Sequence, residues 1–163
     1  MGDEEWAWLA QWRWRALPDR RKDSFYACRN MRTEDRWITV LMHRVILGLQ
    51  DPETGASPEN CRVDHINGDG LDNRLTNLRR ATHSQNGANQ RLRAGTKTGY
   101  KGVYSLPSGR FGARIRVQGL WFHLGTYPTA IEAALAYNAE AVVRFGIFAY
   151  PNPLYTCRTV STL

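Results

Sequence analysis

The segment that most constrains this chain is residues 63–90, VDHINGDGLDNRLTNLRRATHSQNGANQ. It is dense in Gly, Asn, Asp and Arg, and side chains this small and polar cannot bury enough apolar surface to form a core. Something other than apolar burial must therefore organise the segment, and a bound cation is the leading hypothesis. Asp64 stands next to His65 in it, and Asn77 and Asn86 follow the histidine by twelve and twenty-one positions.

These residue types and their spacing predict a phosphodiesterase centre with one metal ion. Adjacent side chains on a strand point to opposite faces, so Asp64 can hold the ion while His65 faces a reacting water as general base. Asp64 and Asn86 offer hard oxygen ligands, which suit Mg²⁺ best, with Mn²⁺ as a second choice. Asn77 can hydrogen-bond to the backbone near His65 and fix the orientation of the ring. His83 is either an auxiliary ligand or phosphate contact, or a surface residue in a first helical turn.

The same residue types also occur where there is no catalysis. Asn and Asp are common in loops, so an isolated Asp–His pair with later asparagines would be weak support for a catalytic centre. A calcium loop fails because Ile66 and Leu71 fall where an EF-hand needs alternate oxygen ligands. His43 opens the apolar segment HRVILGL, which favours a histidine packed in a core over a metal ligand.

The element pattern predicts an α+β protein. The segment around His65 indicates strand 62–66, loop 67–77, strand 78–81 and a helix that Thr82 caps, running to about residue 92 with Asn86 and Gln90 on one face. Upstream, a short helix leads into a strand within residues 3–17, and two further strands follow at 25–31 and 37–42. The strand–loop–strand–helix part is too small to fold on its own burial, so it must lean on the upstream strands or on a metal.

Beyond residue 98 the sequence alternates strongly. Residues 110–117 place apolar side chains on one face and Arg110, Arg114 and Arg116 on the other, and residues 121–125 place Phe122 and Leu124 inward with Trp121 and His123 outward. With residues 100–105 as a first strand, this predicts a three-stranded antiparallel sheet with one basic, aromatic face. A helix capped by Thr129 is expected to cover the apolar face with the following residues: Ile131, Ala134, Leu135, Val142 and Phe145.

Basic residues are concentrated in one part of the chain. The formal net charge is +7 and the pI about 9.7, yet residues 73–131 contain no Asp or Glu. Their ten basic residues are Arg74, Arg79, Arg80, Arg91, Arg93, Lys97, Lys101, Arg110, Arg114 and Arg116. An acid-free basic run beside a metal-like cluster predicts a polyanionic partner, most simply DNA or RNA. Double-stranded DNA is the expected partner, with Arg79, Arg80, Arg91 and Arg93 among its contacts. A solvated basic surface is the weaker alternative, because such surfaces usually intersperse both signs.

Cysteine usage and the termini exclude several other classes. The three cysteines are far apart and form no C-x-x-C pair, which argues against a zinc knuckle or a disulfide framework and fits a reducing compartment. The acidic start MGDEEWAW is not expected to be a signal peptide, and no apolar run approaches the ~20 residues of a membrane span.

The motif VDHINGDGLDNRLTNLRRAT followed by HSQN resembles the HNH endonuclease family, in the form found in phage and intron-encoded homing enzymes. The segments WRW, YACRN and MHRVILGL also resemble such proteins, so the likeness covers most of residues 4–92. It implies a ββα-metal module in which Asp64 is the first metal ligand, His65 the base, Asn77 the central asparagine and Asn86 the last ligand. Asp64 and Asn86 replace the histidine ligands of better-known members. The resemblance further implies an enzyme that acts in bacterial cytoplasm.

The segments TGYKGVY, GRFGARIRV, FHLGTYPTAIEAALAYNAEAVVRFG and YPNP resemble the APETALA-two/ethylene-response-factor DNA-binding domain of plant transcription factors. The likeness spans residues 98–152. It implies that a major groove is faced by the following residues: Lys101, Tyr104, Arg114, Arg116, Trp121 and His123. Tyr104, Trp121 and His123 differ in identity from the plant forms, so the plant target sequence is not transferred.

The expected organisation is a nuclease domain at 1–92 with its ββα-metal core at about 62–92, a basic linker at 93–98, a DNA-binding domain at 99–152 and a tail at 153–163. The expected function is a DNA endonuclease that leaves 5′-phosphate and 3′-hydroxyl ends. One centre per chain predicts a monomer that nicks one strand, and a double-strand break would need two chains or two visits; a dimer is not excluded. The alternatives are a non-catalytic DNA-binding regulator that keeps the metal module as scaffold, and an RNA-binding module, which suits the narrow A-form major groove less well.

Overall fold

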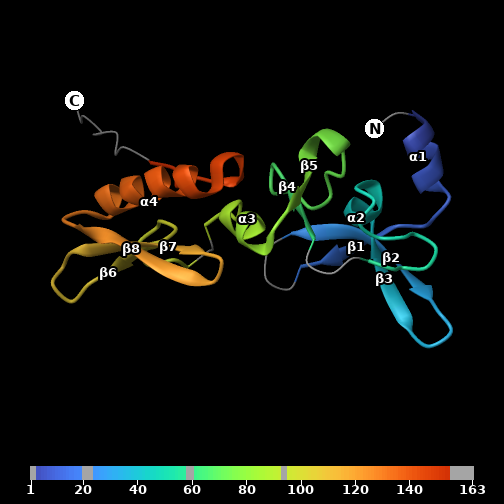
Figure 1. The fold of residues 1–163 in the computed structure, drawn as a ribbon, viewed down its shortest axis with the longest axis horizontal. Coiled ribbons are helices and arrows are strands. Elements are labelled where there is room, and N and C mark those ends of the chain that lie inside the picture. Colours follow the sequence, from blue (N-terminus) through green and yellow to red (C-terminus); the bar gives the residue numbers. More distant parts are fainter. Residues whose placement is uncertain (1–2, 20–23, 58–60, 93–94, 155–163) are drawn as a thin grey trace, which may run out of the picture. The chain divides into compact units, whose positions relative to one another are not determined.

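The fold is mixed α+β, as the sequence pattern predicts, with three small antiparallel sheets of three, two and three strands (Figure 1). A computed structural model describes residues 3–19, 24–57, 61–92 and 95–154 of the 163. The chain divides into two compact units, Met1–Asn89 and Gln90–Leu163. Each unit has its own hydrophobic clusters and is described separately below.

The first sheet of the N-terminal unit is a meander that packs on two short helices. Its elements are α1 (Asp3–Ala10), β1 (Arg15–Pro18), β2 (Phe25–Arg32), β3 (Trp37–Leu41) and α2 (Met42–Ile46). The strands lie in the order β1-β2-β3. Leu9, Val40, Met42 and Val45 form the core, with the rings of Trp12 and Trp14 packed against it.

The polar segment around His65 folds as a hairpin followed by a helix: β4 (Arg62–His65), β5 (Leu78–Ala81) and α3 (His83–Ala88). The two strands are antiparallel, and Asp64 lies opposite Arg79. Thr82 caps α3, and its side chain and that of Gln85 form a reciprocal capping box.

The prediction that this helix continues to about residue 92 is wrong, because α3 ends at Ala88 and Gln90 lies beyond it. Two features account for the early end. Gly87 weakens the last turn, and Asn89 leaves the helix so that its side chain can bond to β4. The expected pairing of Asn86 and Gln90 on one helical face is therefore absent.

The hairpin and helix do lean on the upstream part of the unit. Val63 and Leu78 share a small cluster with Leu49, which follows α2. Gly70, in the loop between β4 and β5, lies so close to β2 that an added Cβ would sit 2.4 Å from the carbonyl oxygen of Phe25. Apolar burial and this close approach hold a segment that has little core of its own.

The C-terminal unit is a three-stranded sheet covered by one helix: β6 (Val103–Ser105), β7 (Phe111–Val117), β8 (Leu120–Tyr127) and α4 (Ala130–Phe145). The strand order is β6-β7-β8. Val103, Ala113, Ala133 and Ala134 form the core between sheet and helix. Thr129 and Glu132 form the capping box at the start of α4.

The sequence pattern assigned the wrong face of α4 to the sheet. Ala134 and Phe145 are buried as expected, but Ile131, Leu135 and Val142 are 43%, 48% and 56% exposed. The residues that face the core are mostly small: Ala133, Ala134, Tyr137, Ala141 and Phe145. Alanines allow the helix to approach the sheet closely. Close packing therefore decided which face of α4 is buried, rather than the greater hydrophobicity of Ile131, Leu135 and Val142.

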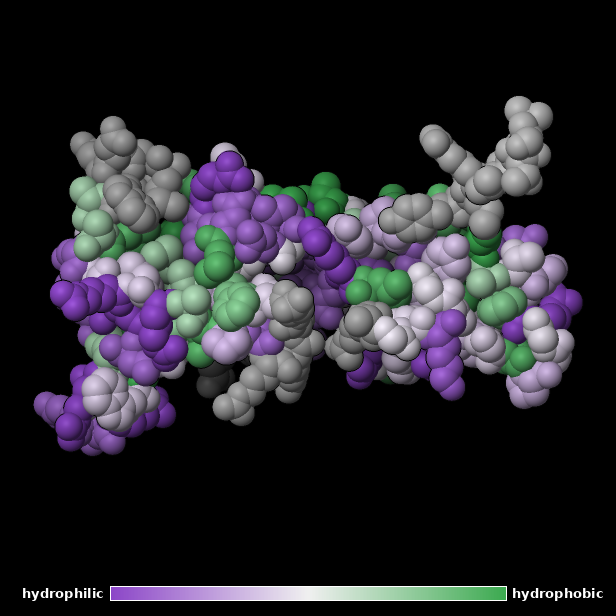
Figure 2. Space-filling model, turned by 180° about the vertical axis from the view of Figure 1, so that it is seen from behind, coloured by the Kyte–Doolittle hydropathy of each residue, from purple (hydrophilic) through white to green (hydrophobic). Residues whose placement is uncertain are grey.

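On the face seen in Figure 2, hydrophilic and hydrophobic residues are interspersed. Within the described ranges, none of the helices has the length and apolarity that a bilayer span demands. Cys28 and Cys61 are free thiols, and Cys157 lies outside the described residues.

Candidate active site and nucleic-acid face

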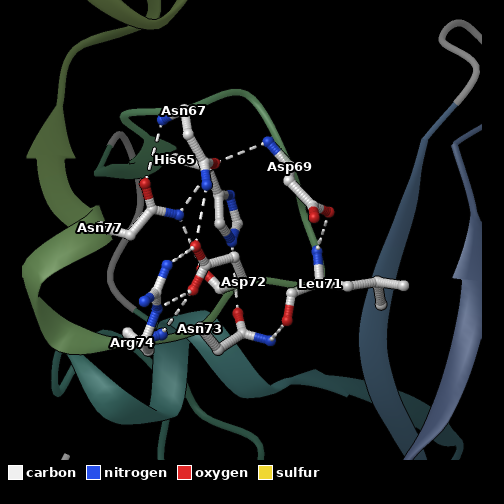
Figure 3. Close-up of polar contacts among 8 residues, drawn as sticks. All are labelled: His65, Asn67, Asp69, Leu71, Asp72, Asn73, Arg74 and Asn77. Carbon is white, nitrogen blue, oxygen red and sulfur yellow. Dashed lines mark hydrogen bonds and ion pairs between the residues drawn. The ribbon is translucent and has the colours of Figure 1, made fainter.

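The loop between β4 and β5 is built from bonds between short polar side chains and the backbone (Figure 3). The Asn67 Oδ1 accepts from the backbone of Asp69, and the Asp69 carboxylate accepts from the backbone of Leu71. Asn77 joins the two ends of the loop, because its Oδ1 accepts from the backbone N–H of Asn67 and its Nδ2 donates to the carbonyl of Asp72. Asn and Asp are dense here because their side chains replace the missing strand hydrogen bonds.

The His65 ring sits inside this loop and is only 7% exposed. Its Nε2 lies 3.2 Å from the Oδ1 of Asn73, while the Nδ2 of Asn73 donates to the carbonyl of Leu71. Burial lowers the pKa of His65 below its usual value, against the opposing effects of the Asn73 hydrogen bond and the nearby Asp64. The ring is thus far more enclosed than the expectation of a histidine facing open water.

Asn77 makes no hydrogen bond to the His65 ring. It binds the backbone just after His65: its backbone carbonyl accepts from the N–H of Ile66, and its side-chain Oδ1 accepts from the N–H of Asn67. The predicted contact with backbone near His65 is therefore present, but the hydrogen bond to the imidazole comes from Asn73. Asn73 was not predicted from the sequence, although the D-N-R triplet that contains it stands inside the motif.

Two further rings enclose His65. Its centroid lies 5.0 Å from that of His43 on α2 and 5.9 Å from that of Tyr26 on β2. His43 is buried, as its apolar neighbours in sequence predicted, but it packs on the candidate base. Its Nδ1 has no hydrogen-bond partner in the described part of the chain, and burial lowers its pKa to about 3. His43 is therefore a neutral ring at physiological pH.

Asp64 is buried with only 3% exposure and is held by two partners. Its Oδ2 lies 2.7 Å from the guanidinium of Arg79, and its Oδ1 accepts from the Nδ2 of Asn89 at 2.9 Å. Asn89 also donates to the carbonyl of His65. Arg79 was predicted to contact DNA, but its side chain is only 14% exposed and is paired with Asp64, which is its cross-strand neighbour.

The donor set of this site fits a hard divalent cation. An ionised carboxylate can accept about four hydrogen bonds, and Asp64 accepts one from Arg79 Nε and one from Asn89 Nδ2, so acceptor capacity remains for a metal. Asn86 lies on α3 three residues before Asn89, and its half-buried side chain makes no hydrogen bond to any described residue. Clusters of three or more His, Cys, Asp or Glu are absent from the described ranges, so water and substrate would complete the coordination.

The outer face of the C-terminal sheet gathers five of the predicted groove-facing residues. The guanidinium of Arg114 lies 4.3 Å from the centroid of the Trp121 ring and 5.1 Å from that of Tyr104. The Arg116 guanidinium also lies over Trp121, and the Tyr104 hydroxyl is 3.2 Å from the Nδ1 of His123. Arg114 is opposite His123 and Arg116 opposite Trp121 across β7 and β8. Stacking holds these cationic side chains in place.

Lys101 does not belong to this face. Its ammonium donates to the carbonyl oxygens of Gln90 and Tyr150 and lies over the rings of Tyr137 and Tyr150. Burial lowers its pKa to about 8. Gly102, with φ of 78°, turns the chain just before β6, so Lys101 lies outside the strand, whereas the resemblance to the plant DNA-binding domain implied a groove-facing position for it.

The remaining predicted contacts are spread over the surface. Arg110 is exposed and donates to the carbonyl of Thr126, while Arg80 donates to the carbonyl of Leu47. Arg91 is exposed, His83 is exposed in the first turn of α3, and Arg93 lies outside the described residues.

Comparison with known proteins finds a family match for this part of the chain. Residues 40–88 match the family described as HNH endonuclease, a range that includes the hairpin, α3 and the rings of His43 and His65. This segment is therefore similar to the HNH endonuclease domain, a domain type of nucleases, which hydrolyse phosphodiester bonds.

A relative supports the same family. This chain is 35% identical over 100 residues to a protein of Acanthamoeba polyphaga mimivirus that is named an uncharacterized HNH endonuclease. The similarity covers 61% of this chain and spans 51%, about half, of the relative's length. No solved structure matches the chain.

Proposed function

We propose that this chain is a metal-dependent DNA endonuclease that cuts through its HNH domain and binds its target through the C-terminal sheet. The observation that carries the proposal is the pair Asp64 and His65 on β4, with the ring of His65 fixed by Asn73. This pair lies within the range that matches the HNH family.

The chemistry assigned to His65 is the removal of a proton from a water that attacks phosphorus. Although the ring is mostly buried, its Nδ1 makes no hydrogen bond to a described residue and so keeps a lone pair for this task. A divalent ion, Mg²⁺ by preference or Mn²⁺, would be held by Asp64 and Asn86 and would stabilise the charge on the phosphoryl group and the leaving oxygen. The expected products are a 5′-phosphate and a 3′-hydroxyl.

Binding to duplex DNA is assigned to the basic, aromatic face of Arg114, Arg116, Trp121, Tyr104 and His123. Guanidinium groups pair with phosphates and guanine edges, and a sheet of this size can enter a major groove. The resemblance to the APETALA-two/ethylene-response-factor domain supports the same assignment. With one centre per chain, the proposed enzyme is a monomer that nicks one strand, and a homing-type enzyme of a phage or mobile element in bacterial cytoplasm is the proposed setting.

Supercoiled plasmid with added Mg²⁺ provides the test. We expect conversion to the nicked form, suppression by EDTA, and loss of cutting in Asn86→Ala with duplex binding retained. Full activity in EDTA would overturn metal dependence, and full activity of Asn86→Ala would remove that residue from the ligand set.

The second candidate is a non-catalytic DNA-binding regulator that keeps the HNH domain as a scaffold. It is favoured by one observation, namely that Asp64 is held by Arg79 and Asn89 and that His65 is mostly buried. Tight duplex binding with no cleavage under Mg²⁺, Mn²⁺ or other divalent ions would favour the regulator.

A further inference from the structure

We propose that Asn73 is a positioning residue that holds the His65 ring with its proton on Nε2, so that Nδ1 offers its lone pair to the attacking water. The proposal rests on the proposed function for the reaction itself, but its central claim concerns only the ring. Asn73 lies in the loop between β4 and β5, and its side chain is 6% exposed.

The orientation of the Asn73 amide follows from its own hydrogen bonds (Figure 3). A carbonyl oxygen can only accept, so the group that lies 3.2 Å from the carbonyl of Leu71 must be the NH₂ of Asn73. The amide oxygen therefore faces the imidazole, and it lies 3.2 Å from the Nε2 of His65. A flipped amide would place two lone pairs against each other at the Leu71 contact.

The orientation of the amide selects the tautomer of the ring. Because Oδ1 of Asn73 can only accept, Nε2 of His65 must be the nitrogen that carries the proton. A neutral imidazole has a single ring proton, so Nδ1 is left with a free lone pair. Nδ1 makes no hydrogen bond to any described residue. The tautomer that Asn73 selects thus leaves the lone pair of Nδ1 available to a water.

The neighbouring rings do not make this selection. Tyr26 and His43 contact His65 through their rings, and the Tyr26 hydroxyl bonds to Asp19 instead. Asn77 bonds to the loop backbone and to the side chain of Asn67. Within the described part of the chain, Asn73 is the residue that hydrogen-bonds the imidazole, and its Oδ1 accepts from Nε2.

The loop keeps Asn73 in place. The backbone N–H of Asn73 also donates to Leu71, whose own N–H is bound by the carboxylate of Asp69. Gly70 packs against the ring of Tyr26, where an added Cβ would lie 2.6 Å from the ring. These contacts prevent the amide from turning away without disrupting the loop, so the tautomer is built into the fold.

Long-range ¹H–¹⁵N correlation spectra of the full chain report directly which nitrogen of His65 is protonated. We expect the Nε2–H form in the wild type and a mixture of both tautomers in Asn73→Leu, which has a similar size but no acceptor. Asn73→Asp keeps an acceptor and should keep the Nε2–H form. In single-turnover cleavage, Asn73→Leu should be slower by about 10–100-fold at an unchanged duplex Kd, and Asn73→Asp should recover most of the rate.

Arg74→Gln is the matched control, because Arg74 adjoins Asn73 in the same loop but its side chain is 71% exposed. Its His65 signals should match those of the wild type. A wild-type ring with its proton on Nδ1, or an unchanged ring spectrum in Asn73→Leu, would overturn the proposal. If no form of the protein cuts DNA while Asn73→Leu still shifts the tautomer, the positioning role stands and the proposed function fails by itself.

Discussion

At the scale of single residues, the site is defined by side chains that fix each other's protonation and orientation. The spacing of the motif identified Asp64 and His65, because their chemistry is visible in the residue types. Their partners Asn73, Asn89 and Arg79 could not be identified in the same way. The partners depend on the register of β4 with β5 and on the path of an irregular loop, and neither is encoded by a simple period.

His43 makes a prediction about pH at this scale. Burial lowers the pKa of His43 to about 3, against 6.5 for a free histidine. Between these pH values His43 is therefore protonated in the unfolded chain and neutral in the folded chain. This difference makes the free energy of unfolding decrease as pH falls from 6.5 toward 3, by up to about 1.4 kcal/mol per pH unit. It contributes nothing above that window.

Urea unfolding of the wild type and His43→Gln between pH 4 and pH 7 measures this effect. The variant should lose stability less steeply as pH falls, whatever its stability at pH 7. Parallel curves would contradict a neutral, buried His43.

At the scale of elements, strands were easier to predict from sequence than helix faces and helix ends. Alternation identified the outer face of the C-terminal sheet, because side chains on a strand have a fixed period of two. Helix α4 presents alanines to the sheet and leaves Ile131 and Leu135 exposed, since close packing favoured small residues over hydrophobic ones. Lys101 lies off this face because it precedes β6 and the chain turns at Gly102 before the strand begins.

The loop between β4 and β5 makes the second prediction. Gly70→Ala should destabilise the N-terminal unit by about 1–3 kcal/mol, because the added methyl would lie 2.4 Å from the Phe25 carbonyl and the loop would have to move. Gly87→Ala is the matched change: it lies in α3 and its methyl would meet nothing within 4 Å, so we expect stabilisation of up to about 1 kcal/mol. Equal effects of the two substitutions in denaturant titrations would contradict the close approach of loop and strand.

At the scale of the whole molecule, the chain combines a unit with similarity to the HNH endonuclease family and a second compact unit whose sheet carries stacked arginines. The excess of basic residues is consistent with a polyanionic partner for the whole chain. The sequence predicted both kinds of chemistry, but the depth at which His65 and Asp64 are buried emerged only from the fold.

The sheet makes the third prediction, which concerns salt dependence. Arg116→Ala should weaken binding of duplex DNA by about 1–3 kcal/mol if the residue reads a base, and should reduce the salt slope by about one if it pairs with a phosphate. Arg144 on α4 is ion-paired with Glu140, so Arg144→Ala is the comparison and should change neither. Fluorescence anisotropy across a salt series measures both quantities, and a wild-type slope and affinity in Arg116→Ala would remove it from the interface.

The most direct test of the account is the single-turnover cleavage rate of a duplex by the wild type and by His65→Ala, with Mg²⁺ present and all DNA bound. If His65 is the general base, the substitution should reduce the rate by at least about 100-fold while the duplex Kd stays the same. Cleavage by His65→Ala at the wild-type rate would contradict the account.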